Sequence, residues 1–225
     1  MNIRIDRSTK FARLAALVIC VPLLGGCVGA AVVGAGAGAL MVVDRRASET
    51  YIADQGLELR ANSRISEKYG DKVHVNATSY NRMMLLTGEV PTAEIKADVE
   101  KIAAGVTDVK SISNELAIAG PSSYGVRGND SYITSKVKAR FIDAGKFSAH
   151  VVKVVTEAGV VFLLGMVTQA EANAAVEIAR TTGGVQKVVR VFEIITPEQA
   201  KALDNTAPPA ASAPAQDAKP TPAKK

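Results

Sequence analysis

Cys27 is the residue whose surroundings most clearly indicate a covalent reaction. It follows Leu24-Gly25-Gly26 at the end of an apolar run, Leu14–Leu24, and a basic segment, residues 1–13, precedes that run. A basic segment followed by a short apolar segment is typical of a secretion signal that is removed from the mature protein. The run is too short to cross a bilayer, which takes about 20 apolar residues. Residues 1–26 are therefore predicted to be a signal peptide, and the Cys27 thiol is available for modification.

Residues 24–27 resemble a bacterial lipobox, in which an aliphatic residue and two small residues precede the cysteine. The resemblance implies that Cys27 becomes the first residue of the mature chain and carries a thioether-linked diacylglycerol and an N-acyl group. Several acyl chains anchor durably, because each buried CH₂ contributes about 0.8 kcal/mol. Val28 takes the position at which Asp retains enteric-type lipoproteins in the inner membrane, so we expect lipid anchoring in the outer membrane, on its periplasmic face. Ordinary secretion with an incidental cysteine is the alternative.

Composition argues against several other classes of chemistry. Cys20 lies within the predicted signal, so no thiol remains for a disulfide, a thiolate metal site or a cysteine nucleophile once Cys27 is acylated. The chain has 27 basic and 22 acidic residues, and the signal holds four of the former and one of the latter. The mature chain then carries 23 against 21, a net charge of +2, which indicates no nucleic-acid partner.

The segments at both ends of the mature chain have little to bury. Residues 27–47 form the lipidated spacer, which is rich in Gly and Ala and reads VGAAVVGAGAGALMVV at Val28–Val43. A flexible spacer that leaves the membrane surface is one interpretation, and a glycine zipper that associates through close backbone contact is the other. Residues 198–225 are mostly Ala, Pro and Lys, and we expect a disordered tail there.

The remaining sequence contains an internal repeat, which determines the architecture. LLTGEVPTAEIKADVEKIA at Leu85–Ala103 matches FLLGMVTQAEANAAVEIAR at Phe162–Arg180 with an offset of 77. The matched pairs include Gly88 and Gly165, Val90 and Val167, Glu94 and Glu171, and Val99 and Val176. We expect a first domain at residues 48–119, a linker at 120–128 and a second domain at 129–197.

Each copy of the repeat has the pattern helix, strand, strand, helix, strand. A capping box at Thr168 and Glu171 marks the start of one helix. The predicted elements of the two copies are, in order, Gly56–Lys68 and Ser131–Ala144, Val73–Thr78 and Val151–Thr156, Met83–Thr87 and Val160–Leu164, Thr92–Ala104 and Gln169–Thr182, and Val109–Ala119 and Val188–Thr196. The expected fold class is α+β, with two tandem α-β-β-α-β domains, each a three-stranded mixed sheet packed on two helices.

This arrangement resembles the BON domain, present twice. The resemblance is carried by LTGEV and LLGMV with their glycines Gly88 and Gly165, by the helices AEIKADVEKIA and AEANAAVEIAR, and by the following GVTDVKSISNEL and GVQKVVRVFEI. With the lipobox, the chain is similar to the outer-membrane lipoproteins that contain two BON domains. The family implies domains that are not enzymes, that bind phospholipid and that contribute to envelope integrity. The long Ala/Pro/Lys tail departs from that pattern.

The residues themselves offer no convincing catalytic set. His74 and His150, the two histidines, do not occupy equivalent positions of the repeat, and no HExxH, GxSxG or phosphate-binding loop occurs. His74 falls on the polar side of its predicted strand, where a solvated side chain is a simpler interpretation than a metal ligand or a general base. We therefore predict no enzyme activity, no catalytic residue, no metal site and no cofactor.

A membrane-facing surface is predicted on the first helix of the second domain. At 100° per residue, Ile133, Val137 and Phe141 form the inward stripe, and the outward and flanking positions combine apolar groups with lysines. The predicted lipid-binding residues are Tyr132, Ser135, Lys136, Lys138, Ala139 and Ile142, together with Phe147 in the following loop. Apolar groups of this kind insert into a membrane surface while lysines meet anionic headgroups. The equivalent helix of the first domain looks less apolar on its outside.

Two classes of function follow. The first is a lipid-anchored protein that binds the anionic phospholipid membrane through its second domain and supports the cell envelope. The second is a periplasmic adaptor whose two domains bind envelope proteins or peptidoglycan. Single exposed apolar residues are normal on any protein, so the residues alone leave both classes open, and the family resemblance favours the lipid surface.

Overall fold

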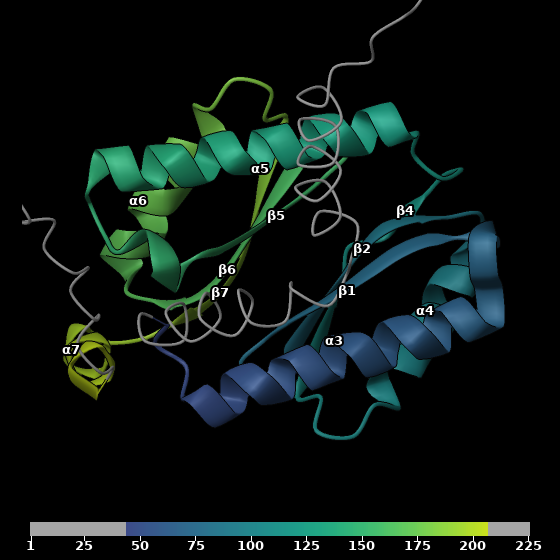
Figure 1. Cartoon of the computed structure of the whole chain (residues 1–225), viewed down its shortest axis with the longest axis horizontal. Helices are drawn as coiled ribbons and strands as arrows, with labels where there is room; N and C mark the ends of the chain where they lie inside the picture. Colours follow the sequence, from purple (N-terminus) through teal and green to yellow (C-terminus); the bar gives the residue numbers. More distant parts are fainter. Residues whose placement is uncertain (1–43, 207–225) are drawn as a thin grey trace, which may run out of the picture. The chain divides into compact units, whose positions relative to one another are not determined.

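The structure, a computed structural model, describes residues 44–206. These residues belong to one compact unit, in which the two repeats follow each other along the chain (Figure 1). The predicted signal peptide, Cys27, most of the spacer and residues 207–225 of the predicted tail lie outside the described residues.

Both repeats have the predicted order of elements, except that the predicted strand Val109–Ala119 of the first repeat is divided into two short strands. The first contains α3 (Ser48–Tyr69), the short 3-10 helix η2 (Gly70–Lys72), β1 (His74–Tyr80), β2 (Met83–Val90), α4 (Ala93–Ala104), β3 (Ser111–Asn114) and β4 (Ala117–Ile118). The second contains α5 (Tyr124–Ala144), the 3-10 helix η3 (Ala149–Val151), β5 (Lys153–Glu157), β6 (Val160–Val167), α6 (Gln169–Arg180) and β7 (Lys187–Ile194). In each sheet the central strand, β2 or β6, pairs antiparallel with β1 or β5 and parallel with β3–β4 or β7. The predicted α+β fold class is confirmed.

Each repeat has a core of its own, and a third apolar cluster joins the two sheets. Within each repeat, the buried side of the long helix packs on its own sheet, for example through Phe141 on α5. The third cluster consists of Tyr80 and Leu85 from the first repeat and Phe162, Leu164 and Val191 from the second. Strands β2 and β6 are therefore buried on both faces, which accounts for their mostly apolar sequences.

The two long helices begin earlier than predicted. α3 begins at Ser48 rather than Gly56, and α5 begins at Tyr124 rather than Ser131, within the predicted linker. The glycines of this stretch suggested a linker, but the Ser123 hydroxyl accepts a hydrogen bond from the Val126 backbone N–H and caps the helix. A capped first turn that continues into a packed helix tolerates glycine, whose cost is about 1 kcal/mol per residue.

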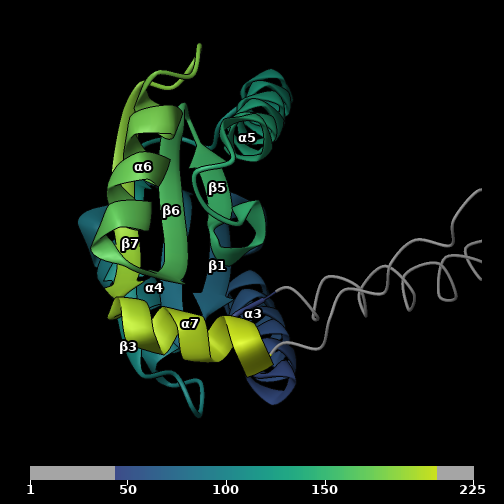
Figure 2. The ribbon, with the colours of Figure 1, turned by 90° about the vertical axis from the view of Figure 1, so that its left-hand side faces the viewer.

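Part of the predicted disordered tail is a helix. α7 spans Pro197–Thr206, and Figure 2 shows it crossing below the end of β7 towards the beginning of α3. The prediction of disorder is wrong for residues 198–206, because Ala200 is buried and Asp204 accepts a hydrogen bond from Arg45 Nε at 2.8 Å. The Arg45 guanidinium also donates two hydrogen bonds of 2.8 Å to Glu171 at the start of α6.

The last residues of the predicted spacer are also built into the fold. The Arg46 side chain is 3% exposed and pairs with Asp44 at 2.6 Å and with Asp54 at 2.8 Å. Its guanidinium carbon lies 4.1 Å from the centroid of the Tyr80 ring, and burial raises the pKa of that tyrosine to about 12. The segment 44–46 is therefore part of the globular body, unlike the spacer that we predicted over residues 27–47.

One buried aspartate in each long helix fixes the hairpin turn of its own repeat. Asp54 accepts hydrogen bonds from the backbone N–H groups of Asn81 and Arg82 at 2.8 and 2.7 Å. Asp130, at the equivalent place in α5, accepts hydrogen bonds of 2.9 and 2.8 Å from the two residues of the second turn. All four turn residues have positive φ, which is typical of two-residue hairpin turns.

We predict that Asp54→Ala destabilises the protein more than Asp130→Ala does. Both changes leave buried turn amides without acceptors, at a cost of about 1–3 kcal/mol. The Asp54 change also removes one partner of the buried Arg46, which raises the expected loss to roughly 3–5 kcal/mol. Urea unfolding measures both, with Asp143→Ala, at an exposed position on α5, as the control. Equal losses for the two buried aspartates would contradict this role of the Arg46 pair.

Candidate functional site

The outer face of α5 exposes the apolar side chains that the sequence placed there. Tyr132 is 62% exposed and Ile142 is 66% exposed, whereas Phe141, one position earlier, is 0% exposed. Ser135, Lys138 and Ala139 are exposed as well. Five of the predicted lipid-binding residues therefore lie on one open surface, and whether that surface binds lipid remains a prediction.

Lys136 and Phe147 lie differently from these five. The Lys136 ammonium donates a hydrogen bond to the Gly183 carbonyl oxygen and lies 4.9 Å from the centroid of the Tyr132 ring, so it is half-buried beside the surface. Phe147 is half-buried against the core and meets the Phe141 ring edge-on, with 5.1 Å between centroids. Phe147 therefore packs at the edge of the core, at the border of this surface.

Tyr124 extends the surface by a residue that the sequence analysis missed. It is 88% exposed and precedes Ile142 by 18 positions, which is five full turns of an α-helix, so the two side chains share one face. They are separated by about 27 Å along the helix axis. The sequence contains a signal for this earlier helix start, because Ser123 is a typical N-cap residue.

The equivalent helix of the first repeat also has apolar groups on its outside. Ile52 is 60% exposed and Leu59 is 73% exposed, and their spacing of seven residues brings them onto one face of α3. This helix is still less apolar outside than α5, as expected, because α5 exposes four large apolar side chains, those of Tyr124, Val126, Tyr132 and Ile142. α3 and α5 are therefore both candidates for a binding surface.

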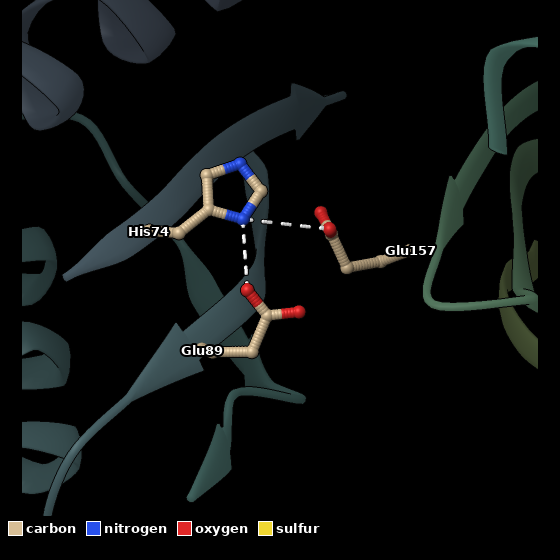
Figure 3. A group of neighbouring side chains, drawn as sticks. All are labelled: His74, Glu89 and Glu157. Atoms are coloured by element: carbon tan, nitrogen blue, oxygen red, sulfur yellow. Dashed lines mark hydrogen bonds and ion pairs between the residues drawn. The ribbon is translucent and has the colours of Figure 1, made fainter. Parts of the chain in front are cut away.

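A second candidate site lies where the two repeats meet (Figure 3). His74 at the start of β1 has Glu89 of β2 as its register partner, and its Nδ1 lies 2.9 Å from Glu89 Oε2. The same nitrogen lies 3.6 Å from Oε1 of Glu157, at the end of β5 in the second repeat. Burial raises the pKa of the Glu157 carboxyl, although the nearby His74 opposes the shift.

Polar groups surround this triad of side chains. The Asn76 amide nitrogen lies 3.1 Å from Glu157 Oε2 and 3.3 Å from His74 Nε2, and the Ser122 backbone N–H donates to Glu89 Oε2 at 3.0 Å. A pocket of about 320 Å³ borders His74 and Glu157, with residues of α5 on its other side. The arrangement can hold a proton or a cation between its carboxylates.

The interpretation of His74 as a solvated residue is wrong. Its side chain is only 15% exposed, because the polar side of β1 faces the second repeat at this point rather than water. Glu89, a carboxylate within the otherwise apolar strand β2, was the signal that a polar contact lies on this face. The partner Glu157 could not be inferred, because it is 83 residues away from His74 in the sequence.

Comparison with known proteins identifies the two repeats. A model of the BON domain matches residues 53–120 and 129–196. The chain belongs to the BON-domain family. The first repeat is its first BON domain and the second repeat is its second BON domain, as the resemblance in the sequence implied.

Several known proteins are similar to this chain over different lengths. The chain is 38% identical to the outer membrane lipoprotein DolP of Haemophilus influenzae over 185 residues, 81% of this chain and 96% of that protein. It is 34% identical to a 21 kDa hemolysin of Actinobacillus pleuropneumoniae, over 68% of this chain and 80% of the relative. It is 31% identical to the osmotically-inducible protein Y of Escherichia coli, over 51% and 58%. The predicted similarity to outer-membrane lipoproteins with two BON domains is confirmed.

Across residues 44–206, no helix is long and apolar enough to cross a bilayer.

Truncation of two neighbouring residues of α5 should change the stability of the protein by very different amounts. Phe141→Ala removes a buried ring that also contacts Phe147, and we predict a loss of about 3–5 kcal/mol in the free energy of unfolding. Ile142→Ala truncates a side chain that is 66% exposed, and its effect should stay within about 0.5 kcal/mol. Urea unfolding distinguishes the two, and similar losses would mean that the outer face of α5 is covered.

Proposed function

We propose that this protein is an outer-membrane lipoprotein, anchored on the periplasmic face by acyl chains on Cys27, whose second BON domain binds anionic phospholipid through α5. The observation that carries this proposal is the row of exposed apolar side chains on α5, from Tyr124 through Tyr132 to Ile142. Support for the anchor comes from the lipobox and from the similarity to a lipoprotein over most of the chain. A contribution to envelope integrity follows from the same resemblance.

The physical argument for α5 combines insertion with charge. A helix that lies on a membrane buries apolar side chains at the boundary between headgroups and acyl chains, and cations around them meet the phosphates. Lys138 and Lys146 are exposed on α5 or just after it, and Lys136 lies beside Tyr132. Each lysine near an anionic surface contributes about 1 kcal/mol. Because the acyl anchor already holds the protein at the membrane, a weak second contact is sufficient.

The adaptor function is the second candidate, and α3 is the observation that favours it. Ile52 and Leu59 are exposed on the first BON domain, which the lipid proposal does not use. An apolar pair on one helix face fits a protein partner in the envelope, and peptidoglycan is the other partner class that a periplasmic adaptor would meet.

Replacement of the modified cysteine tests the anchor. Cys27→Ala should give a protein that is released from membranes or remains an uncleaved precursor, because the signal's apolar run is too short for a stable span. Metabolic labelling with a radioactive fatty acid, followed by fractionation, measures both outcomes. Label retained on the Cys27→Ala protein would contradict the lipoprotein assignment.

A double substitution tests the lipid surface. Ile142→Glu with Tyr132→Ala should abolish binding of a soluble chain that starts at Val28 to phosphatidylglycerol or cardiolipin vesicles, because a carboxylate at position 142 must be desolvated beside anionic headgroups. Both side chains are exposed, so stability should be unchanged. Vesicle co-sedimentation measures the binding.

The matched control is the corresponding change on α3, Ile52→Glu with Leu59→Ala. It removes a similar apolar area from the first BON domain and should leave vesicle binding intact. If the α5 variant binds as well as the parent chain, α5 is not the lipid surface. If the α3 variant is the one that fails, the membrane contact belongs to the first domain.

A further inference from the structure

Three metal-ligating side chains converge between the two BON domains without any role in the proposed lipid surface. Zn²⁺ binds imidazole nitrogen and carboxylate oxygen at about 2.0–2.2 Å in tetrahedral sites, which separates neighbouring donor atoms by about 3.3 Å. His74 Nδ1 lies 2.9 Å from the Glu89 oxygen and 3.6 Å from the Glu157 oxygen, and ligand atoms of the three residues all lie within 4.8 Å of one another. The donor atoms are therefore close to the separations that one ion requires.

The charge at this place favours a divalent cation. Glu89 and Glu157 are 5% and 8% exposed, and within residues 44–206 neither makes an ion pair with a lysine or arginine. Arg127, which lines the adjoining pocket, donates to the Ser122 hydroxyl instead, and the carboxylate of Asp130 adds further negative charge. Two buried carboxylates lie side by side here, a divalent ion balances both of their charges, and buried charge is costly until it is compensated.

The groups around the three ligands can orient them. The Asn76 amide nitrogen donates a hydrogen bond of 3.1 Å to Glu157 Oε2 and so orients that carboxylate. The Ser122 backbone N–H, at 3.0 Å, holds Glu89. Such contacts fix the orientation of metal ligands and strengthen binding.

An independent feature of β2 points to a further polar ligand here. Thr87 lies two residues before Glu89, on the same face of the strand and opposite Asn76 in the register. Its hydroxyl is buried and has no hydrogen-bond partner within the described part of the protein, which is unusual because buried polar groups are almost always paired. A metal-bound water, the usual fourth ligand of an open zinc site, is a partner suited to this face, and the pocket beside His74 and Glu157 gives access from solvent.

We propose that His74, Glu89 and Glu157 form a binding site for a divalent transition-metal ion, best matched by Zn²⁺, that links the two BON domains. One imidazole with two carboxylates suits Zn²⁺ rather than Mg²⁺ or Ca²⁺, which take six or more oxygen ligands. Glu157 belongs to the second domain and the other two ligands to the first, so the ion binds only the docked arrangement. Binding to the native state alone stabilises it by mass action.

The test uses the full acylated chain, purified in detergent, stripped with EDTA and dialysed. Titration with Zn²⁺ in a calorimeter should show one saturable site, and Zn²⁺ should raise the unfolding temperature where Mg²⁺ at the same concentration does not. Co²⁺ should give a visible absorption band of the bound ion, which reports coordination independently of stability. His74→Ala should weaken Zn²⁺ binding by more than the roughly 100-fold loss that outer contacts produce and should remove the Co²⁺ band.

His150→Ala is the matched control, because His150 is the chain's second histidine and is exposed. It should leave Zn²⁺ binding unchanged. Glu157→Gln keeps the side chain's shape and serves as the second ligand variant if His74→Ala fails to fold, and it should weaken binding comparably. The proposal is overturned if the parent chain takes up no Zn²⁺, if the ligand variants bind Zn²⁺ as the parent does, or if His150→Ala is the variant that loses binding.

Discussion

Burial of the second face of each small sheet is the constraint on which the rest of the structure depends. Two helices cover one face of each sheet, and a domain of this size buries only a modest share of its surface when it folds alone. The cluster formed by Tyr80, Leu85, Phe162, Leu164 and Val191 covers the other face of both sheets at once. Each domain thereby supplies the missing layer of the other.

This docking also decides which surfaces remain available. The inner faces of α3 and α5 are used by their own cores, so their outer faces are left for partners. Polar residues at the margin of the docked sheets, His74 and Glu157 among them, become neighbours only through this contact. The membrane surface and the metal site that we propose therefore arise from one arrangement, although neither requires the other.

The segment through which the chain enters the fold is bound to both BON domains. Arg45 joins α6 and α7 through Glu171 and Asp204, while Arg46 lies over the Tyr80 ring between the two sheets and pairs with Asp54. In a lipoprotein these residues come 18 and 19 positions after the acylated cysteine. A pull on the anchor would thus act on both BON domains, rather than on a loose end of the first.

Local patterns in the sequence predicted much of the fold. The features that these patterns did not predict depend on contacts between residues far apart in the sequence. The structure confirms the features that depend on neighbouring residues. These are the repeat, the apolar strands β2 and β6, the Thr168–Glu171 capping box and the buried stripe on α5. The helix α7 depends on Arg45, more than 150 residues away, and the burial of His74 depends on the second domain. Five of the seven predicted lipid-binding residues lie on the open face, because helical spacing determines that face once the core stripe is known.

The most direct test of the account is nuclear magnetic resonance of the soluble chain in bicelles with and without phosphatidylglycerol. We predict that signals from the outer face of α5, from Tyr124 to Ile142, shift or broaden selectively in the anionic bicelles, while Ile52 and Leu59 on α3 stay unchanged. Perturbation centred on α3, or none on α5, would contradict the central claim that the second BON domain meets the membrane through this helix.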